Sequence, residues 1–147
     1  MPGFQLDAFL PYQLSVLSAR VSRGFAELYR AQFGISVTEW RVLAHLSQSE
    51  AVSVREITDR VDLEKSKVSR AAKRLQAEGY VSKRPHETDG RLVALSLTEK
   101  GRSLVEAVAP IAHTYQADVL DVLGGDAPDF QAALTTLLRA TGGNSRP

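Results

Sequence analysis

One stretch near the middle of the chain changes from a helical period to a strand period, and this change restricts the fold more than any other feature. Between Lys65 and Glu78 apolar residues recur every three or four positions, as on one face of a helix, and Gly79 ends that pattern. Tyr80–Arg84 and Leu92–Leu97 then have the pattern of two strands around the polar segment His86–Arg91. The sequence therefore predicts a helix followed directly by a β-hairpin.

Two short helices are predicted ahead of this stretch, because each begins with a capping box. Ser36 is followed three residues later by Glu39, and Ser53 is followed by Glu56 in the same way. In this pattern the serine hydroxyl accepts a hydrogen bond from the glutamate amide, and the glutamate side chain reaches back to the serine amide. Residues 36–97 thus have the element order of a helix-turn-helix with a β-wing.

Long amphipathic helices are predicted on both sides of this central part. The first covers residues 12–33, the second begins after Thr98, and Asp126 is expected to cap a last helix. Their apolar faces are broader than the small central part can cover. We therefore expect a mainly α (α+β) fold with one domain over residues 1–147, in which residues 6–34 and 98–141 form a dimerisation bundle.

Composition excludes several classes of function. The chain has no cysteine, so it can form neither disulfides nor thiolate metal sites, and it has no thiol-based redox switch. No apolar run approaches the roughly 18–20 residues that span a bilayer. The first ten residues lack the basic region that opens a signal peptide. We therefore expect a cytoplasmic protein that has no membrane partner.

The motifs indicate neither catalysis nor metal binding. His45, His86 and His113 are scattered along the chain, and none belongs to a metal-binding spacing such as H-E-x-x-H. The chain also lacks a glycine-rich phosphate loop and a nucleophile elbow. We expect no enzyme activity, no cofactor and no metal site.

The distribution of charge points to a nucleic-acid partner. The net charge of the whole chain is only +1. Between Lys65 and Arg84, however, seven basic residues stand against a single acid, Glu78. A nearly neutral protein with one basic stretch attracts a polyanion to that stretch alone.

The exposed side of the predicted helix 65–78 carries the donors that a helix in a DNA major groove needs. Ser66, Arg70 and Lys73 share one stripe, and Arg70 is able to donate two hydrogen bonds to O6 and N7 of guanine. Lys67 and Ser69 flank the stripe, and the residues that suit phosphate contacts are Lys65, Lys73 and Arg74. A solvated surface helix carries the same residue types, so that alternative stays open.

Further candidates for DNA contact lie outside this helix. Arg91, at the tip of the predicted hairpin, suits a narrow minor groove, and Asp89 can accept a hydrogen bond that directs it. The same residues also fit a plain Asp-Gly hairpin turn. Lys83 and Arg84 either contact phosphates or keep an edge strand soluble. Ser53, at a helix start, either helps to grip a phosphate or only caps its helix.

Five fragments in this order and spacing resemble a known family. They are Ile35–Leu43, Ser53–Ile57, Lys65–Arg70, Glu78–Val81, and Asp89–Arg91 followed by Leu95–Gly101. Together they resemble the MarR family (multiple antibiotic resistance regulators) over nearly the whole chain. The resemblance implies a bacterial transcription regulator, usually a repressor, that binds palindromic double-stranded DNA as a homodimer through one winged helix-turn-helix per subunit.

The chain departs from the family pattern at two positions of the predicted recognition helix. Glu64 stands where the family usually has a capping Ser or Asp, and Lys67 stands where a small hydroxyl residue is common. Lys67 therefore puts the family's base preference in doubt for this chain. The lack of cysteine removes the family's thiol-oxidation mode of sensing.

The resemblance also implies a small aromatic ligand, which many relatives hold between the dimer helices and the DNA-binding lobe. Tyr12, His45 and Tyr115 are the candidates to line such a site, and plain core packing explains them equally well. The alternative function is a winged-helix module that contacts only other proteins. Such modules usually lack a basic recognition face, which favours the DNA-binding interpretation.

Overall fold

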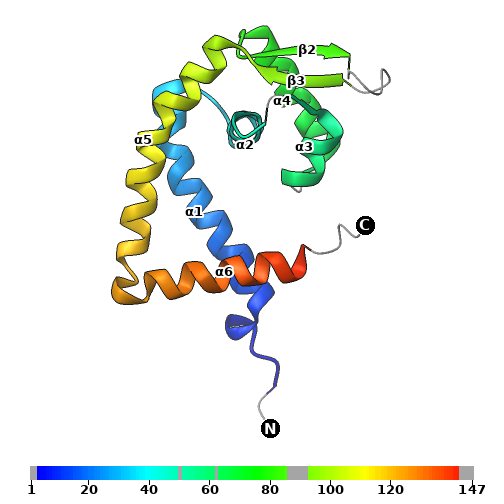
Figure 1. Ribbon diagram of the computed structural model, residues 1–147. Coiled ribbons are helices and arrows are strands. Elements are labelled where there is room, and N and C mark those ends of the chain that lie inside the picture. Colours follow the sequence, from blue (N-terminus) through cyan, green and yellow to red (C-terminus); the bar gives the residue numbers. More distant parts are fainter. Residues whose placement is uncertain (1–2, 50, 62, 86–92, 143–147) are drawn as a thin grey trace. The chain divides into compact units, whose positions relative to one another are not determined.

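The computed structural model describes residues 3–49, 51–61, 63–85 and 93–142 of the chain (Figure 1). It divides into two compact units, Met1–Ile111 and Ala112–Pro147, and the division falls inside the helix α5. The elements in chain order are η1 (Leu6–Ala8), α1 (Leu10–Phe33), α2 (Val37–Ser47), β1 (Val52–Ser53), α3 (Val54–Val61), α4 (Lys65–Ala77), β2 (Val81–Pro85), β3 (Val93–Leu97), α5 (Glu99–Asp121), η2 (Gly124–Asp126) and α6 (Ala127–Thr141).

Both predicted capping boxes are present. At the start of α2 the Ser36 hydroxyl accepts from the Glu39 amide at 3.1 Å, and the Ser36 amide donates to the Glu39 carboxylate at 2.9 Å. The same pair of bonds joins Ser53 and Glu56, at 3.0 and 3.2 Å. Each box satisfies amides that the first helical turn leaves without a partner.

The helix α4 ends as Gly79 predicts. Gly79 has φ +83°, in the left-handed region. Its amide donates to the carbonyl of Gln76 at 3.0 Å, and the Tyr80 amide donates to the carbonyl of Leu75 at 2.9 Å. These two bonds form a Schellman motif, which turns the chain out of the helix and into β2. At the other end, Glu64 occupies the cap position without a side-chain hydrogen bond.

The hairpin strands are joined by a third strand that the sequence did not predict. The antiparallel order is β1-β3-β2, with Val52 opposite Leu95 and Val81 opposite Leu97. With only two residues, β1 is too short to show a strand period, and it is recognisable only through its pairing with β3. The edge strands of the sheet are therefore β1 and β2.

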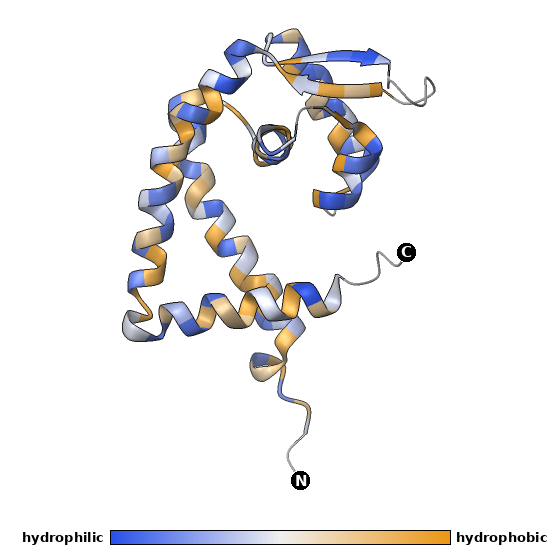
Figure 2. Ribbon diagram, viewed as in Figure 1, coloured by the Kyte–Doolittle hydropathy of each residue, from blue (hydrophilic) through white to orange (hydrophobic). Residues whose placement is uncertain are grey.

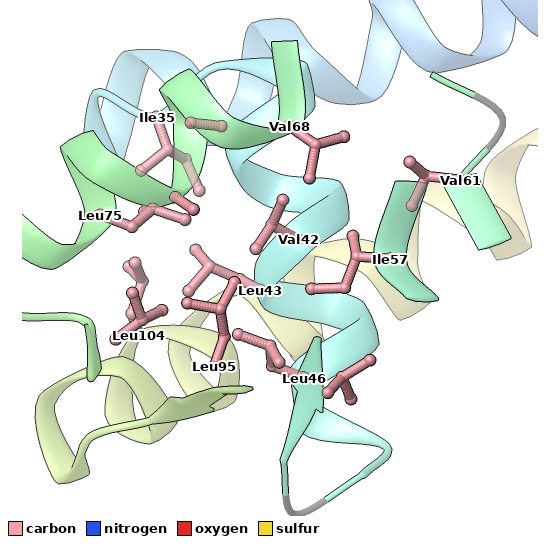
Figure 3. Close-up of a cluster of buried hydrophobic side chains, with 14 of the residues drawn as sticks. Ile35, Val42, Leu43, Leu46, Ile57, Val61, Val68, Leu75, Leu95 and Leu104 are labelled. Carbon is pink, nitrogen blue, oxygen red and sulfur yellow. The ribbon is translucent and has the colours of Figure 1, made fainter. Parts of the chain in front are cut away.

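The hydrophobic core of the first unit lies where α2, α3, α4 and the sheet meet (Figure 3). Val42, Leu43, Ile57, Val68 and Leu95 are completely buried there, and their side chains come from four different elements. α1 adds Ala26 and Tyr29 to the same cluster, and α5 adds Leu104 and Val108. The predicted inward faces of α2, α3 and α4 are thus confirmed as core.

Trp40 is partly buried and packs at the edge of this core. Its ring lies 5.6 Å from the ring of Phe25 at an interplanar angle of 89°, and 5.8 Å from the ring of Tyr29. The contact with Phe25 is edge-to-face, an arrangement that stabilises aromatic clusters beyond the area that it buries. Trp40, in α2, therefore packs that helix against α1.

The second unit consists of the end of α5, η2 and α6. Gly124 has φ +58°, and Asp126 occupies the N-cap position of α6, although its side chain makes no capping hydrogen bond. No residue of α6 is buried, and Leu138 is 70% exposed. Figure 2 shows hydrophobic residues recurring along α6. None of the helices in the described ranges has both the length and the apolar content that crossing a membrane requires.

Candidate nucleic-acid interface

The helix α4 has one buried face and one exposed face. Its buried residues are Val68, Ala71, Ala72 and Leu75. At about 100° of rotation per residue, Ser66, Arg70 and Lys73 lie on the opposite side, and all three are exposed. The helix therefore presents a hydroxyl, a guanidinium and an ammonium group to solvent from one stripe.

One flank of this stripe faces a basic hollow. Lys65 and Ser69 of α4 line a hollow of about 580 Å³ together with Arg55 of α3 and Lys83 of β2. Among the described residues that line it, Asp59 is the one acid. Arg55 is exposed and was not singled out from the sequence, because one arginine inside a capping box gives no signal of its own.

The other flank carries an ion pair to α2. The Arg74 guanidinium Nε lies 3.5 Å from a carboxylate oxygen of Glu39. The Glu39 side chain is only 6% exposed, whereas that of Arg74 is 57% exposed. A carboxylate that is buried this far needs an opposite charge. Arg74 thus has a partner within the fold, which its sequence position did not indicate.

The structure separates the remaining candidates by exposure. Ser53 is 1% exposed, and its hydroxyl accepts from the Glu56 amide, so the capping role is the one that its geometry supports. Lys83 is half-buried and Arg84 is exposed, and both lie on the edge strand β2. Asp89 and Arg91 lie outside the described residues.

The three candidates for ligand contact fall in different parts of the chain. Tyr12 is 39% exposed in the first turn of α1, and His45 is half-buried in the last turn of α2. Burial lowers the pKa of His45 below its usual 6.5, and the charge of Arg60 lowers it further. Tyr115 is half-buried in the second unit.

A second hollow, of about 480 Å³, adjoins the end of α2. Leu46, Leu97 and Val105 give it an apolar lining, and Gln48 and Arg102 are among its polar lining residues. A volume of this size suits a small organic molecule. Its residues come from α2, β3, α5 and the segment after α2, so no single sequence motif could reveal it. Within the described ranges, no three His, Asp or Glu side chains gather closely enough to hold a metal ion.

Known proteins share both the sequence pattern and the fold. Residues 33–92 match the model of the MarR family. The chain is 32% identical over 108 residues to the HTH-type transcriptional regulator TtmR of Methylorubrum extorquens, a match that covers 71% of this chain and 55% of TtmR. The match to SarZ of Staphylococcus epidermidis, at 26% identity, covers 58% of each protein. The chain thus spans little more than half the length of these curated relatives.

Solved structures match over more of the chain. A MarR/EmrR family transcriptional regulator from Acinetobacter sp. ADP1 is 30% identical, with a TM-score of 0.80, and the match covers 94% of this chain and 97% of that one. A MarR family transcriptional regulator from Silicibacter pomeroyi DSS-3 is 29% identical, with a TM-score of 0.81, over 94% of this chain and 98% of that one.

Proposed function

This chain belongs to the MarR family of transcriptional regulators, and on that premise we propose that it regulates transcription by inserting α4 into the major groove of double-stranded DNA. The observation that carries the proposal is the two-faced character of α4. One face is anchored in the core by Val68 and Leu75, and the opposite face exposes Ser66, Arg70 and Lys73. A groove-reading helix needs both properties.

Two kinds of contact have separate roles in this proposal. Arg70 reads base edges, because its guanidinium can donate two hydrogen bonds to one guanine. Lys65, Lys73 and Lys83 contact phosphates, which hold the protein in position without specifying sequence. The basic hollow between α3, α4 and β2 supports this assignment, since Lys65 and Lys83 both line it. For Asp89 and Arg91 the sequence alone supports a minor-groove contact.

We propose a homodimer as the DNA-binding form. Large apolar side chains are exposed on α1, where Leu10, Leu17 and Leu28 are each close to half exposed, and in the second unit, where Val122 is 86% exposed. The three leucines of α1 are spaced by 7 and 11 residues and so share one stripe, and a contiguous exposed apolar stripe is normally covered by a partner. A twofold dimer reads an inverted repeat whose half-sites lie about 10 base pairs apart.

We also propose that the protein represses transcription and that a small aromatic ligand releases it from DNA. Repression follows from the usual mode of the family. The hollow of about 480 Å³ next to α2 supports a ligand, because it combines an apolar lining with polar groups. Leu46, which lines this hollow, directly follows His45 in the sequence. A role of Tyr12 and Tyr115 in ligand contact is supported by the sequence resemblance alone.

A selection experiment tests the DNA-binding proposal. The purified protein and its Arg70→Ala variant are each incubated with a pool of fragments from the source genome at two salt concentrations. We expect the wild type to retain a few fragments that share an inverted repeat, with retention falling as salt rises. The variant should lose this selectivity. A wild type that retains no fragment above background, even at low salt, would favour the alternative of a module that binds only proteins.

A further inference from the structure

The turn that ends α4 is bonded to the start of α5 by the side chains of Thr98, which directly precedes α5, and Lys100, in its first turn. We propose that Thr98 and Lys100 are positioning residues, which hold the recognition helix at the angle that base reading requires. This inference rests on the proposed function, because it assumes that α4 enters the groove. It concerns residues that neither lie on the exposed stripe of α4 nor touch its core face.

Thr98 joins the two helix ends through one hydroxyl group. That hydroxyl donates to the carbonyl of Gly79 at 2.6 Å and accepts from the amide of Gly101 at 3.0 Å. The Thr98 amide adds a bond to the carbonyl of Tyr80 at 3.0 Å. The residue that caps the start of α5 is therefore bonded to the turn that ends α4.

Lys100 makes a second connection to the same turn. Its Nζ donates to the carbonyl of Glu78 at 2.7 Å and lies 4.7 Å from the centre of the Tyr80 ring. A positive charge at a helix C-terminus is favourable, because the last carbonyls carry the negative end of the helix dipole. The ammonium group of Lys100 is thus engaged with α4.

Gly101 keeps this junction tight. A Cβ at position 101 would lie 2.1 Å from the carbonyl oxygen of Tyr80, so only glycine permits the backbones to approach this closely. We name the junction formed by Thr98, Lys100 and Gly101 with residues 78–80 the α4–α5 clamp.

The clamp matters for base recognition because a small rotation of a helix as long as α4 moves its far end by more than a hydrogen-bond distance can vary. Its 13 residues span about 20 Å at 1.5 Å per residue. A swing of about 10° around one end of such a helix moves the other end by about 3 Å, which is enough to break a hydrogen bond to a base. Flexible lysines can still reach phosphates after such a swing. Loss of the clamp should therefore reduce specific binding and spare non-specific binding.

Lys100→Met tests this directly, because methionine retains an apolar stem but cannot donate to Glu78. We expect its affinity for the selected duplex to fall about tenfold, comparable to the loss of one base contact. Its affinity for a scrambled duplex and its salt dependence should match the wild type. Lys100→Arg retains a donor and a cation, so it should recover most of the affinity.

Lys73→Met serves as the matched control, since it removes a proposed phosphate contact. It should weaken binding to both duplexes and reduce the salt slope by about 0.9 per subunit. A Lys100→Met variant that behaves like Lys73→Met would identify Lys100 as a phosphate contact and overturn the positioning role. Unchanged specific binding by Lys100→Met would overturn it as well.

Hydrogen exchange without DNA tests the clamp independently of the proposed function. The amides of Gly79 and Tyr80 should exchange several-fold faster in Lys100→Met and in Thr98→Val, and Thr98→Ser should retain the wild-type rates. Equal rates in all variants would overturn the clamp. A wild type that binds no duplex would overturn the proposed function and the positioning role together, whereas binding that Lys100→Met leaves unaffected would overturn the positioning role alone.

Discussion

Arg74 and Lys73 are adjacent basic residues of α4, yet the structure gives them different surroundings. Both are exposed, but Arg74 lies against the buried carboxylate of Glu39. The sequence predicted the exposed stripe of α4 correctly, because a helical period determines which residues share a face. It could not predict the ion pair, since Glu39 is far away along the chain and only tertiary packing brings α2 beside α4.

The first prediction follows from this ion pair. Arg74→Met should lower the free energy of unfolding by about 1–3 kcal/mol, because it leaves the Glu39 carboxylate buried without its opposite charge. Lys73→Met should change the free energy by less than about 0.5 kcal/mol, as surface substitutions usually do. Urea denaturation of both variants measures the difference. Equal stabilities would mean that Glu39 does not depend on Arg74.

The second prediction concerns His45 and pH. The folded protein lowers the pKa of His45 below its usual 6.5, chiefly through burial and also through Arg60. Protonation then favours the unfolded chain, so the stability linked to His45 is complete above pH 6.5 and is lost as pH falls through the lowered pKa. Thermal unfolding from pH 8 down to pH 5 should show a smaller decline in His45→Gln than in the wild type. Identical pH profiles would refute the linkage.

At the scale of elements, local signals predicted where helices begin and end. A serine followed three residues later by a glutamate marked the starts of α2 and α3, and Gly79 marked the end of α4. These signals are reliable because each depends on hydrogen bonds within a few residues. β1 was missed because its two residues are a strand only by virtue of pairing with β3.

The third prediction tests the end of α4. Gly79→Ala should destabilise the protein by about 1–2 kcal/mol, because alanine pays a steric cost at φ +83°. Space is not the obstacle, as the nearest atom to an added Cβ is 3.8 Å away. Gly125→Ala is the matched control, since position 125 has open space and no positive φ. A Gly79→Ala variant as stable as this control would contradict the Schellman assignment.

At the scale of the whole molecule, the sequence indicated surplus apolar surface but not how that surface is covered. Leu17 is 45% exposed in α1, and Val122 is 86% exposed in the second unit. The two hollows near α2 and α4 also belong to this scale, because their lining residues come from segments far apart in the chain. Pattern and spacing cannot reveal such sites, since they report only on neighbours along one element.

The fourth prediction is that the protein is a dimer in solution. Sedimentation should give about twice the chain mass of 16.0 kDa. Leu17→Glu should shift the protein toward the monomer, because a charge buried at the proposed interface is costly. Ser15→Glu places the same charge nearly opposite Leu17 on α1 and should leave the dimer intact. A wild type that sediments as a monomer at micromolar concentration would contradict the proposed dimer.

The fifth prediction concerns the claim that α4 binds DNA through its basic residues. The affinity for the selected duplex, measured as a function of salt concentration, tests this claim most directly. If Lys65, Lys73 and Lys83 of both subunits each neutralise one phosphate, the logarithm of the association constant should fall against the logarithm of salt with a slope of about −5. Lys73→Gln should reduce the magnitude of that slope by about 1.8, since it removes one contact per subunit. A slope near zero, or one that Lys73→Gln leaves unchanged, would contradict the account.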